Sequence, residues 1–300
     1  MNEQSDPPPE AKGGLTKGAD LLAKVEQMEK NARARKFSTE VIQLPLWDDR
    51  VRGLPNALAR SALFTSANRN EARDNYTRHP ITAVNGVEIY YTGTELRQDD
   101  LDVFLQVIHL ARTMPLGEIV EFSGYSLLRA LGWNPSKENY TRLKGCIDRL
   151  SANTVHVHFN DGDEKRGYGG SMFRKFAWDE NAKKGSSQRW KIWLEKEIVG
   201  LFGDRDYTKI DWEQRLQLPP LAKWLHQFYF THKEPFGYKA ETIKGLCGSR
   251  IKELSKFRYK LKEALKTLVD VGFLDSWAID RKTDVVLVKR TDRKRLSACH

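Results

Sequence analysis

Residues 250–271 read RIKELSKFRYKLKEALKTLVDV, and this stretch decides the fold expected of the chain. Successive residues of an α-helix are turned by about 100°, which here gathers the apolar side chains on one face. That face holds Leu254, Phe257, Leu261, Ala264, Leu265 and Leu268. The opposite face holds Lys252, Ser255, Lys256, Tyr259, Lys260, Glu263 and Lys266. The pattern predicts a long helix, closed by Gly272, that buries its apolar face and presents the other face outward.

The outward face of this helix is strongly basic. Residues 250–266 contain seven basic and two acidic residues, whereas an ordinary solvated surface mixes the two signs. An α-helix fits the major groove of B-DNA, so we expect this one to bind duplex DNA. Base contacts usually come from the first turn of such a helix. That turn holds Ser249, Arg250, Lys252 and Lys256, while Lys260 and Lys266 are expected at phosphates and Tyr259 shares their face.

The neighbouring segments complete a winged helix-turn-helix. Helical patterns at 219–230 and 240–246 precede the long helix, with a short strand near Tyr238 between them. After the helix, two strand patterns at 273–279 and 284–289 form a hairpin. Its tip, Arg281 and Lys282, is expected beside the DNA. The basic tail at 289–290 and 293–295 would add non-specific electrostatic affinity.

The same order of elements occurs once before. Helical patterns at 96–112, 126–131 and 136–151, with a strand at 119–122 after the first, precede strand patterns at 155–159, 172–178 and 189–194. Ser136 is the expected N-cap of the third helix. The third helix is less basic, so Arg142 and Lys144 are expected to contact DNA with less charge, and the aromatic wing is a candidate surface for self-association. We therefore expect an α+β fold with tandem winged helix-turn-helix domains, at 78–203 and 204–300, the second being the main DNA binder.

The N-terminal segment differs from the rest. Residues 1–50 are polar, with three prolines at 7–9, and predict a flexible, disordered arm. Within it, residues 41–49 form an apolar island. This island is either a strap that docks on the chain's own core or a linear motif for a partner's pocket.

Composition narrows the classes of function. With 50 Lys and Arg against 40 Asp and Glu, the formal net charge is +10, which favours a polyanionic partner. No apolar run approaches the ~20 residues of a membrane span. The three cysteines are far apart, which predicts neither disulfides nor zinc, and a reducing cytoplasm is the natural location. We expect no bound metal, no cofactor, no membrane contact and, without a phosphate-binding glycine loop, no ATPase activity.

These motifs carry a family resemblance. The chain resembles the TrfA-type plasmid replication initiators, of the iteron-binding Rep class, from residues 23–26 through GYSLLRALGW at 124–133 to the C-terminal wing. The resemblance implies monomers that bind direct repeats (iterons) at a plasmid origin and open an adjacent AT-rich segment, exposing single-stranded origin DNA. It also implies recruitment of the host helicase and chromosomal initiator, and inactive dimers that limit copy number.

The resemblance also bears on the apolar island. Residues 43–47, QLPLW, are similar to the pentapeptide by which bacterial proteins dock on the polymerase sliding clamp. Gln43 would bond to the rim of the pocket, Leu46 and Trp47 would fill it, and Leu44 keeps the motif's second position. Pro45 and Trp47 depart from the commoner residues at their positions.

Two other functions remain open. A transcriptional repressor could use the same two DNA-binding units. A rolling-circle nicking enzyme would use His156 and His158, whose i, i+2 spacing places both rings on one face of a strand, with Tyr259 as nucleophile. No third metal ligand can be assigned from the sequence, and both segments already have places in the repeat, so we expect no catalytic residues.

Overall fold

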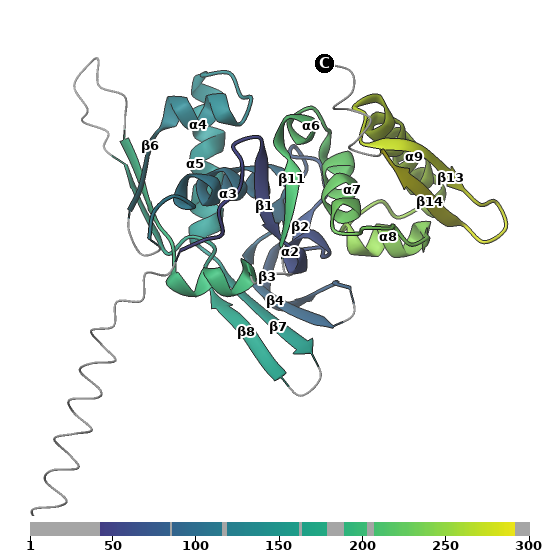
Figure 1. Cartoon of the computed structure of the whole chain (residues 1–300), viewed down its shortest axis with the longest axis horizontal. Helices are drawn as coiled ribbons and strands as arrows, with labels where there is room; N and C mark the ends of the chain where they lie inside the picture. The colour runs from purple at the N-terminus through teal and green to yellow at the C-terminus, as the bar shows by residue number, and fades with distance from the viewer. Residues whose placement is uncertain are drawn as a thin grey trace, which may run out of the picture. The chain divides into compact units, whose positions relative to one another are not determined.

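The computed structural model describes residues 43–84, 86–115, 119–161, 164–178, 189–202 and 207–291. Contacts divide the chain into Met1–Val41 and Ile42–His300, and every described residue lies in the second unit. That unit is a mixed α/β fold of helices and small sheets (Figure 1). The arm predicted for 1–50 is described only from Gln43 onward, and the tail at 293–295 also lies outside the described residues. No described helix is long and apolar enough to cross a membrane.

The C-terminal elements follow the predicted order. They are α7 (Pro220–Phe230), β12 (Tyr238–Lys239), α8 (Ala240–Leu246), α9 (Leu254–Asp270), β13 (Leu274–Ile279) and β14 (Val285–Arg290). The three strands form an antiparallel sheet in the order β12-β14-β13. The long helix begins at Leu254 rather than near Arg250, because residues 248–253 form a turn in which Gly248 has a positive φ of 61°.

The preceding elements repeat this arrangement. They are α3 (Gln98–Ala111), β6 (Ile119–Ser123), α4 (Gly124–Ala130), α5 (Lys137–Ser151), β9 (Lys175–Trp178) and β10 (Arg189–Trp193). The strands pair in the order β6-β10-β9, so the first strand again lies beside the last. Ser136 caps α5 as predicted, its Oγ accepting a hydrogen bond from the Asn139 amide at 3.3 Å.

The strand pattern at 155–159 belongs to a different sheet. It forms β7 (Thr154–Asp161), which makes a hairpin with β8 (Glu164–Gly170). This hairpin extends β3 (Asn75–Ile81) and β4 (Val87–Thr94) into the antiparallel sheet β3-β4-β7-β8. The prediction that residues 155–159 form a wing strand was therefore wrong. Besides β8, β7 pairs with β4, which lies more than sixty residues earlier, and periodicity along one strand does not identify its partners.

Several described elements had no counterpart in the sequence prediction. They are β1 (Val51–Pro55), α2 (Asn56–Ala59), β2 (Phe64–Thr65), β5 (Leu96–Arg97), the 3-10 helix η1 (Lys196–Phe202), β11 (Tyr207–Asp211) and α6 (Trp212–Leu216). β1 pairs with β11 in antiparallel register, and β2 pairs with β5 in parallel. The first pairing joins residues before position 78 to residues after position 204, across both predicted domain boundaries.

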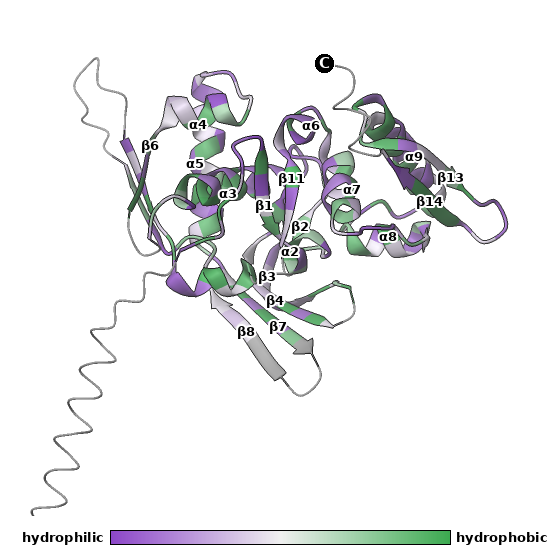
Figure 2. Cartoon of the chain, viewed as in Figure 1, coloured by the Kyte–Doolittle hydropathy of each residue, from purple (hydrophilic) through white to green (hydrophobic). Residues whose placement is uncertain are grey.

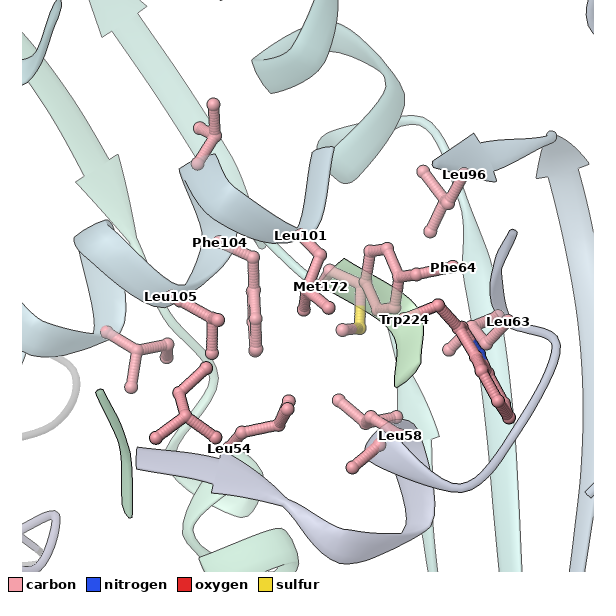
Figure 3. Close-up of a cluster of buried hydrophobic side chains, with 14 of the residues drawn as sticks. Leu54, Leu58, Leu63, Phe64, Leu96, Leu101, Phe104, Leu105, Met172 and Trp224 are labelled. Atoms are coloured by element: carbon pink, nitrogen blue, oxygen red, sulfur yellow. The ribbon is translucent and has the colours of Figure 1, made fainter. Parts of the chain in front are cut away.

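The core is centred on α3. Figure 3 shows Leu101, Phe104 and Leu105 of this helix among Leu54, Leu58 and Trp224, which come from β1, α2 and α7. Every residue from Gln98 to His109 is buried, so α3 lacks the solvent-facing side of an ordinary amphipathic helix. Its carboxylates consequently need partners inside the protein.

Asp102 has such partners from the second half of the chain. The guanidinium of Arg215 in α6, fully buried, donates to Asp102 at 2.7 Å, and Lys223 of α7 pairs with the same carboxylate. Arg215 also donates to Gln98 at 2.9 Å and to Gln227 at 3.2 Å. This network fastens α3 to α6 and α7, and none of its buried side-chain nitrogen or oxygen atoms lacks a hydrogen-bond partner.

Candidate nucleic-acid interface

The basic face of α9 lies where the helical pattern predicts. Phe257, Leu261, Ala264, Leu265 and Leu268 are buried, and Leu254 is partly buried. All seven residues assigned to the opposite face are exposed, including Tyr259 at 61%. We call the exposed cations Lys252, Lys256, Lys260 and Lys266, together with Tyr259, the basic ridge. Figure 2 shows hydrophobic and hydrophilic residues interspersed along α9, as two opposed faces require.

Ion pairs on the ridge leave its charge available. Lys256 pairs with Glu253 at 2.8 Å and Lys260 with Glu263 at 2.8 Å, both between exposed side chains three residues apart. The hydrogen bond from Lys260 holds the pKa of Glu263 below its ordinary value. Such exposed pairs are weak and screened by salt. A phosphate can therefore displace them at little cost.

The C-terminal hairpin is fixed against α9. Arg258 donates from Nε and from a terminal nitrogen to the two carboxylate oxygens of Asp284, at 2.8 and 2.9 Å. The turn at the hairpin tip is closed by Asp280, which accepts from the amides of Lys282 and Thr283. Arg281 and Lys282 are exposed, as a contact with DNA would require. Helical periodicity does not reveal this role of Arg258, because its partner Asp284 lies 26 residues further along the chain.

Arg250 is exposed, but its guanidinium is bound by other parts of the protein. Its guanidinium donates to the Ala72 carbonyl at 2.9 Å and to Glu95 at 2.7 Å, and it pairs with Asp74 at 2.7 Å. Glu95 is buried and also pairs with Arg97. The structure thus makes Arg250 a link between the loop before β3 and the turn before α9. The Ser249 hydroxyl accepts from the Ile251 amide in the same turn. Of the first-turn candidates, Lys252 and Lys256 are the ones with exposed ammonium groups.

Arg142 and Lys144 of α5 are packed against aromatic rings. The guanidinium of Arg142 lies 3.6 Å from the centroid of Trp133, and it is 3.5 Å from Asp99. The ammonium of Lys144 lies 3.9 Å from the centroid of Trp178. Contact with DNA would have to compete with these cation–π interactions, which are worth about 0.5–2 kcal/mol each. These contacts make α5 the weaker of the two candidate DNA-binding helices.

From Gln43 onward, the apolar island is a strap that docks on the core. Trp47 is 6% exposed, its ring stacks on Phe202 at 6.1 Å, and Nε1 donates to His109 Nδ1 at 3.0 Å. Leu44 is also buried. A Cβ on Gly53 would lie 2.7 Å from the Trp47 ring, so the absence of a side chain at residue 53 makes room for the indole.

The rest of the strap is more open. Gln43 is exposed and donates to the Arg112 carbonyl at 3.1 Å, and Leu46 is 65% exposed. Arg112 donates to the Trp47 carbonyl at 3.1 Å and also pairs with Asp49. Burial, with Arg52 and Arg112 nearby, lowers the pKa of His109 to about 4. His109 is therefore neutral near pH 7, which suits its acceptance of the indole N–H.

The residues of the nicking hypothesis lie on different elements. His156 and His158 are exposed on β7, and Tyr259 is on α9. Among the described residues, the potential metal ligands that cluster are Asp99, Asp100 and Cys146. That cluster is buried and occupied by arginines: Arg149 pairs with Asp100 at 2.7 Å, and Arg73 pairs with Asp100 at 2.7 Å and with Asp99 at 3.2 Å. Its charge is balanced without a metal ion.

Comparison with known proteins identifies related sequences. The family model described as "TrfA protein" matches residues 12–290. A plasmid replication initiator protein TrfA from Escherichia coli is 33% identical over 285 residues, which cover 92% of this chain and 73% of that protein.

Solved structures support the fold. Crystal structures of RctB domains 2 and 3 align with TM-scores of 0.55 and 0.54 at 14% and 13% identity. They cover 80% and 79% of this chain, and 99% and 97% of their own. The sequence match extends over most of the chain, and we conclude that the chain belongs to the TrfA protein family.

Proposed function

We propose that this protein initiates plasmid replication by binding repeated sequences at a plasmid origin through two winged-helix units. The basic ridge of α9 beside an exposed hairpin tip is the observation that carries the proposal. The repeated strand order, β6-β10-β9 and β12-β14-β13, supports a winged helix in each half. Membership of the TrfA family favours an initiator over a transcriptional repressor with the same units.

The lysines of the basic ridge are expected to have two roles, contact with bases and contact with phosphates. We expect Lys252→Ala or Lys256→Ala to weaken binding to the origin repeat by about tenfold or more, and binding to random DNA by less, because both flank the start of α9 where bases are read. Lys266→Ala, further along the helix, should weaken both alike and reduce the dependence of log K on log salt by about 1, as loss of one phosphate contact does. Fluorescence anisotropy with both duplexes at several salt concentrations measures these effects.

The matched control is Lys196→Ala, which removes an exposed lysine from η1. It should leave both affinities unchanged. Equal effects of the three ridge substitutions on repeat and random DNA would contradict the division of roles. Tandem, evenly spaced protection of the origin in a footprint is expected of an initiator.

We propose that residues 43–47 are the docking peptide for the sliding clamp. The exposed Leu46 supports this role, while the buried Leu44 and Trp47 mean that the peptide has to leave the core to fill a partner's pocket. Leu46→Ala is expected to reduce retention of the protein on immobilised clamp by about tenfold. Leu287→Ala, which removes a leucine that is 53% exposed on β14, is the matched control. Equal retention of both variants and wild type would remove the clamp from the proposal.

The remaining parts of the proposal rest on the family. They are opening of the AT-rich segment, recruitment of the host helicase and chromosomal initiator, a monomer–dimer equilibrium that limits copy number, and action in the bacterial cytoplasm. We further propose a binding protein without catalysis, since the residues of the nicking hypothesis lie on different elements, His156 and His158 on β7 and Tyr259 on α9.

A further inference from the structure

The loop at residues 66–71, which follows β2, is bonded to both halves of the fold. Arg97, the buried residue that caps α3, donates from its guanidinium to the carbonyls of Glu71 at 2.9 Å and Ala72 at 2.8 Å. From the other half, the Cys247 carbonyl at the end of α8 accepts from the Ser66 amide at 2.9 Å. The loop is therefore held in place between α3 and the turn before α9.

The tip of this loop is a tight turn that presents Arg69. The Glu71 amide donates to the Asn68 carbonyl at 3.2 Å, and the Asn70 amide donates to the Asn68 side chain at 3.1 Å. These bonds place Arg69 and Asn70 at the two central positions of a β-turn. Both residues are exposed, and within the described part of the chain the Arg69 side chain forms no hydrogen bond or ion pair. The turn therefore offers an unpaired guanidinium from a backbone that is fixed by Arg97.

A cavity of about 650 Å³ lies between this turn and α9. Arg69 lines it from the turn, and Lys260 and Thr267 line it from α9. Glu71 and Glu263 line it too, and Glu263 is paired with Lys260 at 2.8 Å. The acidic groups offset the basic ones, so the cavity itself is a poor site for a phosphate. The charge that can reach a ligand beyond the cavity is that of Arg69.

Arg69 also lies beside the first candidate DNA-binding helix. It lines a second cavity, of about 160 Å³, together with Arg142 of α5 and Lys223 of α7. The turn thus has a cavity on each side, one shared with α5 and the other with α9. Arg69 consequently stands between the two helices that are proposed to bind DNA.

This position matches the minor groove of a duplex. Two helices that enter successive major grooves from one side bind half-sites about 10.5 base pairs apart. The minor groove faces the protein midway between those half-sites, because each helical turn carries one groove of each kind. Arginine and asparagine are residue types that read the minor groove, and a narrow, A·T-rich groove attracts arginine in particular. A turn that presents Arg69 and Asn70 between α5 and α9 has the side chains suited to that groove.

We infer that Arg69 enters the minor groove between the two half-sites of a repeat, with Asn70 beside it, and there selects A·T pairs. This inference rests on the proposed function and adds a contact between its two winged helices. In the minor groove, G·C differs from A·T by the N2 amino group of guanine, a donor that a guanidinium cannot accept. Arg69 therefore discriminates against that amino group and does not distinguish A·T from T·A.

The first test is a substitution in the full chain. Arg69→Ala should weaken binding to the duplex repeat by about tenfold, the scale of one specific contact, as measured by fluorescence anisotropy. The matched control is Arg50→Ala, which removes an arginine that is 87% exposed in the strap and should bind as wild type does. The unfolding midpoint of Arg69→Ala should equal that of wild type, because the side chain is exposed.

Modified bases then separate the minor groove from the major groove. Replacing the adenines between the half-sites by 2,6-diaminopurine adds an amino group in the minor groove, whereas replacing the thymines there by uracil removes only a methyl group from the major groove. Wild type should bind the diaminopurine duplex about tenfold more weakly and the uracil duplex as well as the unmodified repeat. Arg69→Ala should be insensitive to both modifications.

Four results would overturn the inference. They are wild-type affinity in Arg69→Ala, an equal effect of diaminopurine on wild type and Arg69→Ala, a loss with uracil that depends on Arg69, and a repeat without A·T pairs between its half-sites. The ridge variants distinguish this failure from failure of the proposed function. If Lys252→Ala and Lys256→Ala bind the repeat weakly while Arg69→Ala binds normally, only the minor-groove contact is wrong. If the lysine variants also bind normally, the proposed function is wrong.

Discussion

Replacing Arg215 by alanine is expected to lower the free energy of unfolding by about 3–5 kcal/mol, the cost of leaving a buried charge without its partner. Arg215 is fully buried, and its guanidinium serves Asp102, Gln98 and Gln227 together. Alanine would leave Asp102 with Lys223 alone and two buried amides without a donor. Urea denaturation followed by tryptophan fluorescence measures the change.

Arg50→Ala is the matched control. Arg50 also pairs with an aspartate, Asp48, but its side chain is 87% exposed. Exposed pairs contribute little, so its unfolding midpoint should equal that of wild type. Equal midpoints for Arg215→Ala and Arg50→Ala would contradict the buried network that fastens α3 to α6 and α7.

Trp47→Ala should be comparably destabilising, by about 3–5 kcal/mol, the range for a buried aromatic side chain cut to alanine. The substitution removes the stack on Phe202, the hydrogen bond to His109 and the filling of the space above Gly53. The same denaturation experiment measures it. Leu46→Ala, one residue away and exposed, should change the free energy of unfolding by less than about 0.5 kcal/mol.

Comparing Trp47→Ala with Leu46→Ala tests whether the strap is docked on the core for most of the time or is often released. A loss below about 1 kcal/mol for Trp47→Ala would mean that the strap spends much of its time off the core. A partner that needs Trp47 binds only the molecules whose strap has been released from the core. Its apparent affinity is therefore scaled by the fraction of molecules in that released state.

The sequence alone predicted the elements whose signals are local. The long amphipathic run became α9, Ser136 capped α5, and the hairpin after Gly272 became β13 and β14. For each of these elements, the hydrophobic periodicity and a capping or turn residue predict the same secondary structure, so the prediction does not depend on contacts with distant residues. The α9 face is the part of the candidate site predicted best, because an apolar stripe fixes the outward direction of every other residue.

What the sequence did not predict depends on long-range pairing. His156 and His158 were placed on a wing strand, yet β7 pairs with β4, and the open face they share with Tyr90 arises only from that pairing. Arg250 was taken for a base contact, and its engagement with Glu95 depends on a residue 155 positions away. The helix at 96–112 was predicted from the spacing of its apolar residues, but the burial of its aspartates was not, because it depends on Arg215 and Arg149 from distant parts of the chain.

The shared core around α3 has a consequence for the DNA site. Ion pairs and strand pairing join the two halves across the chain, so α5 and α9 belong to one compact unit. We therefore expect the protein to bind two half-sites only at one separation. Under the proposed function, five base pairs inserted within one repeat would rotate one half-site to the opposite side of the helix, since a turn takes about 10.5 base pairs. Ten inserted base pairs would restore the angle but leave the half-sites about 34 Å too far apart, so neither insertion should be tolerated.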